Sequence, residues 1–288
     1  MFGLRSDGKK IKNIDPFMKF VPHIMFYRND AMVMQSQDYD CEGIDNYILE
    51  KRKTEGIRFT YLDILIASMV RVISQRPKLN RFIMNGKVYK RNNIQISFAV
   101  KKKLIDAAEE TTVKLTFDGT ESIYDIKEKV DAIIMENKGM DKKNDTDKVA
   151  KMLTRVPNFL IKWSTRFVMF MDKHGMLPKS LINASPFHTS VFLVHLKSIK
   201  MPPVYHHIYN FGTTGIFISI GTEKYEPVVA NRETKEIVVK KMLKAGVVVD
   251  ERISDGLYNS LSLRLFKQIM ENPSVLDQRN DNVIKDVD

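Results

Sequence analysis

The stretch that decides the fold lies near the end of the chain and reads Val247-Val248-Val249-Asp250-Glu251-Arg252-Ile253-Ser254-Asp255-Gly256. Three consecutive valines are typical of a buried strand, and the glycine closes the charged turn that follows. After the turn, apolar residues return at helical spacing until Pro273 (Leu257, Leu261, Leu265, Ile269). We therefore expect a strand, a short charged turn and a helix, with the chemistry-bearing residues in the turn.

The first half of the chain alternates between helical and strand patterns. Thr60-Tyr61-Leu62-Asp63 has the form of a capping box, and an apolar helical stripe follows it as far as Pro77 (Leu62, Leu65, Ile66, Met69, Val70, Ile73). Residues 94–100 and 113–117 alternate apolar and polar side chains as strands do. A second helical stripe begins after Thr120 (Ile123, Ile126, Val130, Ile133, Ile134). The local order is helix, strand, strand, helix.

The second half favours a connection, a helix and then strands. Residues 136–148 are polar and indicate an exposed loop, and a helical stretch then runs to about Lys173 and ends around Gly175 and Pro178. Strands are expected at 188–196, 215–221, 236–242 and 246–250. We interpret residues 1–273 as one α/β domain and residues 274–288 as a polar, loose C-terminal tail.

Composition is that of an ordinary globular protein. The chain has 288 residues, 43% hydrophobic and 28% charged. The single Cys41 excludes an intrachain disulfide. The histidines show no metal-ligand spacing, so no metal is expected (His23, His174, His188, His195, His206, His207). Because residues 1–10 have no apolar run, we expect a cytoplasmic protein.

Charge and hydropathy limit the partners. The net charge of +11 suits an anionic partner, yet the basic residues are interspersed with acids and match no nucleic-acid motif, so nucleic acid is not expected. The most hydrophobic region, residues 156–171, is interrupted by Lys162 and Arg166. It indicates an amphipathic helix, buried or interfacial, and no membrane span.

Four marks in order carry a family resemblance: residues 76–81 (Arg-Pro-Lys-Leu-Asn-Arg), 94–101, 215–221 and 250–256. The last resembles the Asp-His-Arg-x-x-Asp-Gly signature of the dihydrolipoamide acyltransferase core of 2-oxoacid dehydrogenase complexes, and the His-His-x-x-x-Asp-Gly of chloramphenicol acetyltransferase. Residues 205–212 (Tyr-His-His-Ile-Tyr-Asn-Phe-Gly) are similar to a stand-alone bacterial subset. The resemblance runs from about Lys10 to Pro273.

The resemblance implies a chloramphenicol acetyltransferase-like two-layer sandwich with a mixed sheet. It also implies a homotrimer whose intersubunit channel admits two thiol-linked substrates, coenzyme A among them. Asp255 would brace the turn, Gly256 would permit close entry into the last helix, and Arg252 matches the family's arginine. The alternative is that these residues have no catalytic role. Asp255 would then be an N-cap acid, Gly256 part of a plain strand-to-helix connection, and Arg252 a surface cation beside Asp250. About 10 residues before the resemblance begins cannot hold a lipoyl domain, so no covalently bound lipoate is expected.

Glu251 occupies the place of the family's catalytic histidine. A thiol titrates near 8.5, about 2 pK units above an imidazole and roughly 4 above a carboxylate. At 1.36 kcal/mol per unit the carboxylate is worse as a base by about 3 kcal/mol. Burial can raise a carboxylic acid to about 8 or 9, but the group is then largely protonated. We expect Glu251 to be a poor base, or simply a strand-end carboxylate.

A second departure concerns the hydroxyl residue with which the family binds the tetrahedral oxyanion. Aligning Leu196 with the family's leucine puts Val194 at that place, whereas a shifted register offers Ser190. Losing one oxyanion donor typically costs about 100- to 1,000-fold in turnover.

Three histidines remain as candidate bases. His206 and His207 precede the central strand and are the alternative to Glu251, although packing histidines are common beside tyrosines; His195 lies inside an expected strand. Two functions stay open: a thiol-dependent acyltransferase with a moved base, and a non-catalytic trimeric binding or scaffolding protein.

Overall fold

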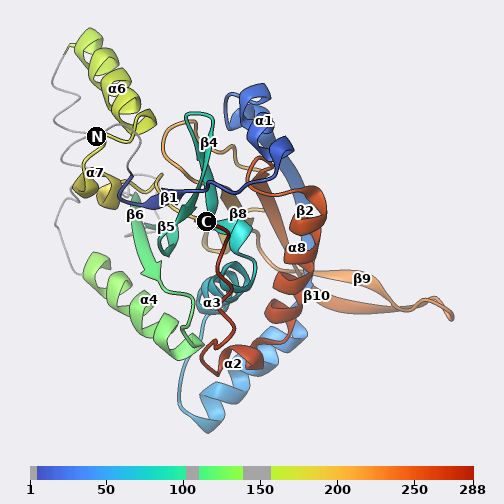
Figure 1. Ribbon diagram of the computed structural model, residues 1–288. Helices are drawn as coiled ribbons and strands as arrows, with labels where there is room; N and C mark the ends of the chain where they lie inside the picture. The colour runs from blue at the N-terminus through green and yellow to red at the C-terminus, as the bar shows by residue number, and fades with distance from the viewer. Residues whose placement is uncertain (1–4, 102–109, 139–156) are drawn as a thin grey trace.

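The main sheet has the strand order β2-β10-β8-β7-β5-β6, with β9 paired to the outer part of β10 (Figure 1). The computed structural model describes residues 5–101, 110–138 and 157–288. The sheet is mixed, because β7 runs parallel to both β5 and β8 while the other pairs are antiparallel. The strands are β2 Met32–Asp40, β5 Ile94–Lys101, β6 Glu110–Phe117, β7 Val191–His195, β8 Ile216–Ile220, β9 Lys224–Asn231 and β10 Glu236–Asp250.

A layer of helices covers one face of this sheet and buries the main core (Figure 1). The layer consists of α2 Glu42–Thr54, α3 Tyr61–Gln75, α4 Ile123–Lys138 and α8 Gly256–Glu271. The capping box expected before α3 is present: Asp63 N–H donates to Thr60 Oγ1 at 3.2 Å, and the Asp63 carboxylate accepts from Thr60 N–H at 2.8 Å. The prediction of a two-layer α/β sandwich with a mixed sheet is confirmed.

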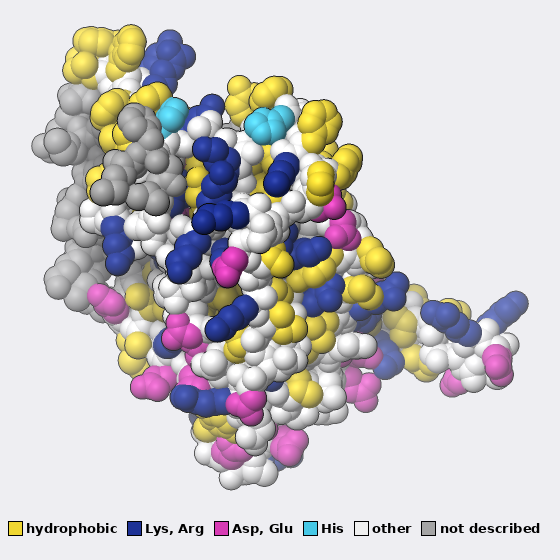
Figure 2. All heavy atoms as spheres, viewed as in Figure 1, with side chains coloured by type: hydrophobic (Ala, Val, Ile, Leu, Met, Phe, Trp, Pro, Cys, Tyr) yellow, Lys and Arg dark blue, Asp and Glu magenta, His cyan; other side chains and the backbone are white. Residues whose placement is uncertain are grey.

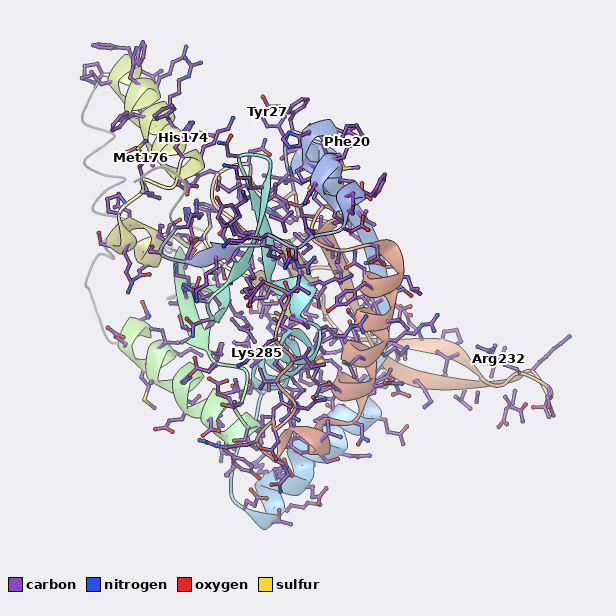
Figure 3. The ribbon with its side chains drawn as sticks, viewed as in Figure 1. Phe20, Tyr27, His174, Met176, Arg232 and Lys285 are labelled. Carbon is purple, nitrogen blue, oxygen red and sulfur yellow. The ribbon has the colours of Figure 1, made fainter. Side chains whose placement is uncertain are left out.

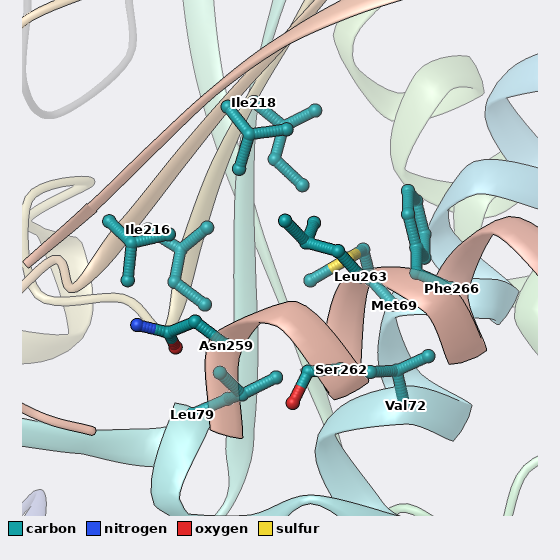
Figure 4. A pocket seen from close by; sticks show the side chains of 11 residues that line it. Met69, Val72, Leu79, Ile216, Ile218, Asn259, Ser262, Leu263 and Phe266 are labelled. Atoms are coloured by element: carbon teal, nitrogen blue, oxygen red, sulfur yellow. The ribbon is translucent and has the colours of Figure 1, made fainter. Parts of the chain in front are cut away.

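The core itself is nearly filled. The space between α3, α8, β8 and β10 measures about 20 Å³ and is walled mostly by aliphatic side chains such as Ile216, Ile218 and Leu263 (Figure 4). A cavity of this size holds about one water molecule. The helices and the sheet are therefore closely packed here.

A second, small sheet of order β1-β4-β3 stands beside the main one. It comprises β1 Gly8–Lys10, β3 Arg81–Met84 and β4 Lys87–Arg91. Asn85 and Gly86, with φ of 51° and 69°, make the tight turn between β3 and β4. Asn-Gly is the strongest short-range hairpin signal in a sequence, yet the strands predicted above do not include this hairpin.

The long strand β10 corrects the expectation of two separate strands at 236–242 and 246–250. Its inner half pairs with β2 and β8, whereas residues 236–242 pair with β9 and form a two-stranded arm. The arm projects from the body, with Arg232 near its tip (Figures 1 and 3).

The remaining helical elements lie outside the helix layer and the strands already named. They are α1 Pro16–Ile24, η1 Asn29–Ala31, η2 Pro77–Asn80, α6 Asn158–Lys173, α7 Lys179–Ala184, η3 Leu196–Ile199 and η4 Pro273–Leu276. Residues 136–138, expected in a loop, end α4 instead, and residues 139–148 lie outside the described part of the chain.

The C-terminal segment 274–288 is bound to the body, which corrects the expectation of a loose tail. Asn280 is buried and donates to Ser74 Oγ at 2.7 Å and to the Gly119 carbonyl at 2.9 Å. The Asp286 carboxylate accepts two 2.6 Å hydrogen bonds from the buried Arg81 guanidinium. The polar composition of this segment suggested a loose tail, but its polar side chains are the groups that bind it to the body.

Candidate functional site

The turn after β10 is built on a buried ion pair. Asp250 and Arg252 have exposed fractions of 1% and 3%, and the guanidinium donates two hydrogen bonds to the carboxylate, at 2.8 and 2.6 Å. Arg252 also donates to the Met25 carbonyl at 2.9 Å. The reading of Arg252 as a surface cation is therefore wrong: it fastens the turn to the segment after α1.

Arg28 adds a second guanidinium to this pair. Its Nε lies 3.9 Å from Asp250 Oδ2, and its other nitrogens donate to the carbonyls of Asn210 at 2.9 Å and Ile83 at 3.1 Å. Burial lowers the pKa of Arg28 to about 10, with Asp250 opposing the shift and Arg252 adding to it. Two cations thus face one carboxylate, and they tie three distant segments to the end of β10.

Glu251 itself takes little part in this network. Its backbone N–H donates to the Ala31 carbonyl at 2.9 Å, and its side chain is partly buried. Within the described part of the chain the Glu251 carboxylate makes neither a hydrogen bond nor an ion pair. The turn holds this residue by its backbone and leaves the carboxylate unengaged.

Asp255 and Gly256 begin the last helix. Asp255 is its N-cap, accepting from Tyr258 N–H at 2.8 Å, and its other oxygen lies 3.6 Å from Lys78 Nζ. The Tyr258 hydrogen bond and, less strongly, Lys78 lower the pKa of the Asp255 carboxyl. A Cβ at Gly256 would meet open space, so close packing does not require the glycine here. Asp255 therefore caps the helix, and the space around Gly256 would admit a larger residue.

The second face of the sheet, opposite the helices, is crossed by residues 202–210, which we call the strap. Ser219 Oγ on β8 fixes it by accepting from Val204 N–H at 2.9 Å and donating to the Val204 carbonyl. A Cβ at Gly246 would lie 2.6 Å from that carbonyl oxygen, so only glycine lets the strap approach β10 this closely. Ile208 then packs on Phe217 and Val248.

The strap presents His206 on this face. Its ring stacks on Phe217 at 4.2 Å with 7° between the planes, and the His207 ring lies 4.6 Å away. His206 Nδ1 is 2.8 Å from the His207 carbonyl oxygen, which can only accept. The hydrogen of a neutral imidazole is therefore on Nδ1, and the lone pair is on Nε2. His206 is half-buried and His207 is exposed.

Comparison with solved structures gives matches along almost the whole chain. A probable dihydrolipoamide acetyltransferase from Listeria monocytogenes is 16% identical, with a TM-score of 0.59 over 96% of this chain and 99% of that one. A dihydrolipoamide acetyltransferase of Azotobacter vinelandii, studied for the role of a serine, a histidine and an asparagine in its catalytic mechanism, is 11% identical, with a TM-score of 0.56 over 93% and 94%. A chloramphenicol acetyltransferase is 12% identical, with a TM-score of 0.53 over 91% of this chain and 99% of that one. The chain has the acyltransferase fold. No family model and no curated protein sequence matches it.

In this acyltransferase fold the expected oxyanion position is apolar. Val194 packs with the Phe217 cluster on the second face. The buried Ser190 hydroxyl donates to Asn80 and accepts from Gln95 N–H at 2.9 Å. His195, at the end of β7, has a buried Nε2 without a described hydrogen-bond partner, and burial lowers its pKa. In the described part of the chain, neither Val194 nor Ser190 nor His195 makes a hydrogen bond or an ion pair with Glu251.

One buried cluster carried no sequence signal. His188 Nδ1 lies 2.8 Å from Ser185 Oγ, and its Nε2 lies 3.1 Å from Asp172, which also accepts from Arg5 at 2.9 Å. Burial lowers the pKa of His188 in spite of Asp172, whereas His188 and Arg5 outweigh burial and lower the pKa of Asp172. Arg5 and Asp172 are 167 residues apart in the sequence, so no local motif could reveal this contact.

Metal and membrane features are limited in the described residues. Among residues 5–101, 110–138 and 157–288, no group of three His, Cys, Asp or Glu side chains could hold a metal ion. In the same ranges no helix combines the length and the apolar character that crossing a bilayer requires. Cys41 is buried and free, and burial raises the pKa of its thiol to about 11.

Proposed function

We propose that this protein transfers acyl groups between thiol carriers, coenzyme A among them, at a site on the second face of the sheet. The support is threefold: the acyltransferase fold over nearly the full chain, the acyltransferases among its structural neighbours, and an imidazole held on the second face of the sheet by the strap. The geometry of His206 is the observation that carries the proposal.

His206 is a better candidate for the base than Glu251. A base that activates a thiol needs a free lone pair and a basicity near that of the thiol. The Nδ1 contact of His206 leaves the Nε2 lone pair available, and stacking on Phe217 fixes the plane of the ring. An imidazole starts about 2 pK units closer to a thiol than a carboxylate does, which is worth about 3 kcal/mol. We therefore assign the proton transfer to His206 and no proton transfer to Glu251.

A homotrimer is part of the proposal. The β9–β10 arm carries apolar cross-strand pairs with exposed members, Val229 with Ile237 and Pro227 with Val239; the exposed fractions of Val229, Ile237 and Val239 are 57%, 66% and 70%. A two-stranded hairpin is marginally stable alone, so an apolar face on a projecting arm favours contact with another copy. One of the structural neighbours is the cubic core of a pyruvate dehydrogenase complex, which is itself an assembly.

The direct test is transfer of labelled acetyl groups from acetyl-coenzyme A to dihydrolipoamide, separated by chromatography. We expect transfer by the full chain, a loss of about 100-fold or more in His206→Ala, and a change of no more than a few-fold in Glu251→Gln. His207→Ala is the matched control, since it removes the adjacent, exposed imidazole.

Two results would contradict the proposal. Abolished transfer in Glu251→Gln with normal transfer in His206→Ala would make the carboxylate the base. Coenzyme A binding in a calorimeter without transfer by the unmodified chain would instead support the binding or scaffolding protein.

A further inference from the structure

Helix α6 exposes an aromatic stripe. Phe159, Trp163, Phe167 and Phe170 recur every three or four residues, which places them on one face, and their exposed fractions are 62%, 69%, 60% and 49%. Large apolar side chains seldom gather on a surface unless something covers them.

A cationic stripe runs beside the aromatic one. Lys162, Arg166 and Lys173 are also spaced at whole turns of α6 and adjoin Phe159 and Phe170 around the helix. The single acid of this helix, Asp172, is turned into the body, where it pairs with Arg5 and His188. The solvent side of α6 therefore combines aromatic and positively charged groups without a negative one.

The region around α1 repeats this character at the same end of the molecule. Phe17, Phe20 and Ile24 share one helical face with exposed fractions of 68%, 59% and 56%, and Phe26 and Tyr27 follow with 74% and 61%. Phe20 and Tyr27 point away from the body on the side where α6 also rises (Figure 3). Hydrophobic side chains gather over both helices, with Lys, Arg and His side chains between them (Figure 2).

Between the two helices lies an open cleft of about 610 Å³. Its walls include Arg166, Lys173 and His23, the acid Asp172, and Arg28 and Arg252 from the buried network, so the basic groups outnumber the acid. Positive groups that line a concave surface concentrate anions there. The cleft thus places anion-attracting groups between two exposed apolar ridges.

We propose that α6 and the region of residues 17–27 form a surface that binds an anionic lipid membrane. Amphipathic helices that lie in a membrane interface carry aromatic and aliphatic residues on one side and Lys or Arg beside them, and tryptophan and tyrosine favour the interface. With 16 residues, interrupted by charges, α6 lies on the bilayer and does not cross it. This inference does not depend on the proposed acyl transfer.

Charge separates this surface from the β9–β10 arm. On the arm, apolar residues alternate with acidic and basic residues, for example Glu226, Glu236 and Lys240. Mixed charge suits a protein partner, such as another copy of the chain. The cations beside the aromatic stripe suit an anionic surface, and the two signals together give stable anchoring where either alone is weak.

The chain has one tryptophan, Trp163, so its fluorescence reports on α6 alone. The experiment titrates the full chain with vesicles of phosphatidylcholine containing phosphatidylglycerol, and with vesicles of phosphatidylcholine only, following emission and co-sedimentation. We expect a blue shift and sedimentation with the anionic vesicles, at least a ten-fold weaker partition to the neutral ones, and weakening as salt is raised.

Two double variants and two matched controls test the stripes separately. Phe159→Ser with Phe167→Ser removes apolar groups, and Lys162→Glu with Arg166→Glu reverses charge; each should weaken the partition ten-fold or more. Leu49→Ser with Met135→Ser, and Arg52→Glu with Lys53→Glu, make comparable changes at exposed positions of α2 and α4 and should leave the partition unaltered. Thermal unfolding in buffer checks that every variant is folded.

Three outcomes would overturn the proposal: equal partition to both vesicle types, unaltered partition of the α6 variants, or Trp163 emission that is already blue-shifted and quencher-protected in buffer and unaffected by vesicles. The last would assign α6 to contact between copies of the chain. None of them bears on acetyl transfer, so failure here and failure of the proposed function are distinguishable.

Discussion

Gly246→Ala should destabilise the protein by pushing the strap off β10. The added Cβ would lie 2.6 Å from the Val204 carbonyl oxygen, 0.8 Å inside the 3.4 Å at which ordinary contact begins. Ser219 holds that oxygen in place, and Cβ would also lie 3.1 Å from the Ser219 hydroxyl. Overpacking of this kind costs about 1–3 kcal/mol, and the loss of glycine's freedom in the unfolded chain returns about 0.4–1 kcal/mol. We expect a net loss of about 1–2 kcal/mol.

Gly256→Ala is the matched control, because nothing lies within 4 Å of its Cβ position. This change should leave stability unaltered or raise it by about 0.4–1 kcal/mol, since alanine also favours the helix. Urea unfolding of both variants measures the difference. Equal effects of the two substitutions would refute the close approach of strap and strand, and with it the placement of His206.

The other predictions concern three further contacts. Asp172→Asn should cost about 3 kcal/mol at neutral pH, because Arg5 and His188 lose their buried partner. His188 and Arg5 hold the pKa of the Asp172 carboxyl below its ordinary value, so its contribution to stability is present above that value and is lost as pH falls through the folded-state pKa. Urea unfolding from neutral to acidic pH should show a flatter acid limb in the variant. Asp286→Asn should cost about 3 kcal/mol by leaving the buried Arg81 unpaired, and a wild-type unfolding midpoint would contradict the docked C-terminal segment. Val229→Ser with Ile237→Ser should shift sedimentation from trimer to monomer with the circular dichroism spectrum unchanged, and a persistent trimer would exclude the arm as its contact.

The layered fold was predictable from local pattern. The capping box before α3 and the apolar stripes of α3 and α8 act over a few residues, so the sequence shows them directly. The valine run before Asp250 likewise marked the inner half of β10. The β3–β4 hairpin was equally visible in Asn85-Gly86 and was overlooked.

The site was less predictable because its contacts join distant segments. Arg252 looks like a surface cation until Met25 and Arg28 surround it, and neither is near it in sequence. The strap had one local signal, the glycine at 246 inside a strand of valines, which marks close backbone approach. The turn at residues 250–256 was visible in the sequence, but its role was not. Its buried Asp250–Arg252 ion pair stabilises the fold and makes no contact with the Glu251 carboxylate.

Rates of acetyl transfer in three chains test the central claim most directly, since that claim assigns the proton transfer to one imidazole. The rates of the unmodified chain, His206→Ala and Glu251→Gln are measured at one neutral pH with acetyl-coenzyme A and dihydrolipoamide. We predict a loss of about 100-fold or more in His206→Ala and a change of no more than a few-fold in Glu251→Gln. A lost rate in Glu251→Gln with an unchanged rate in His206→Ala would contradict the claim.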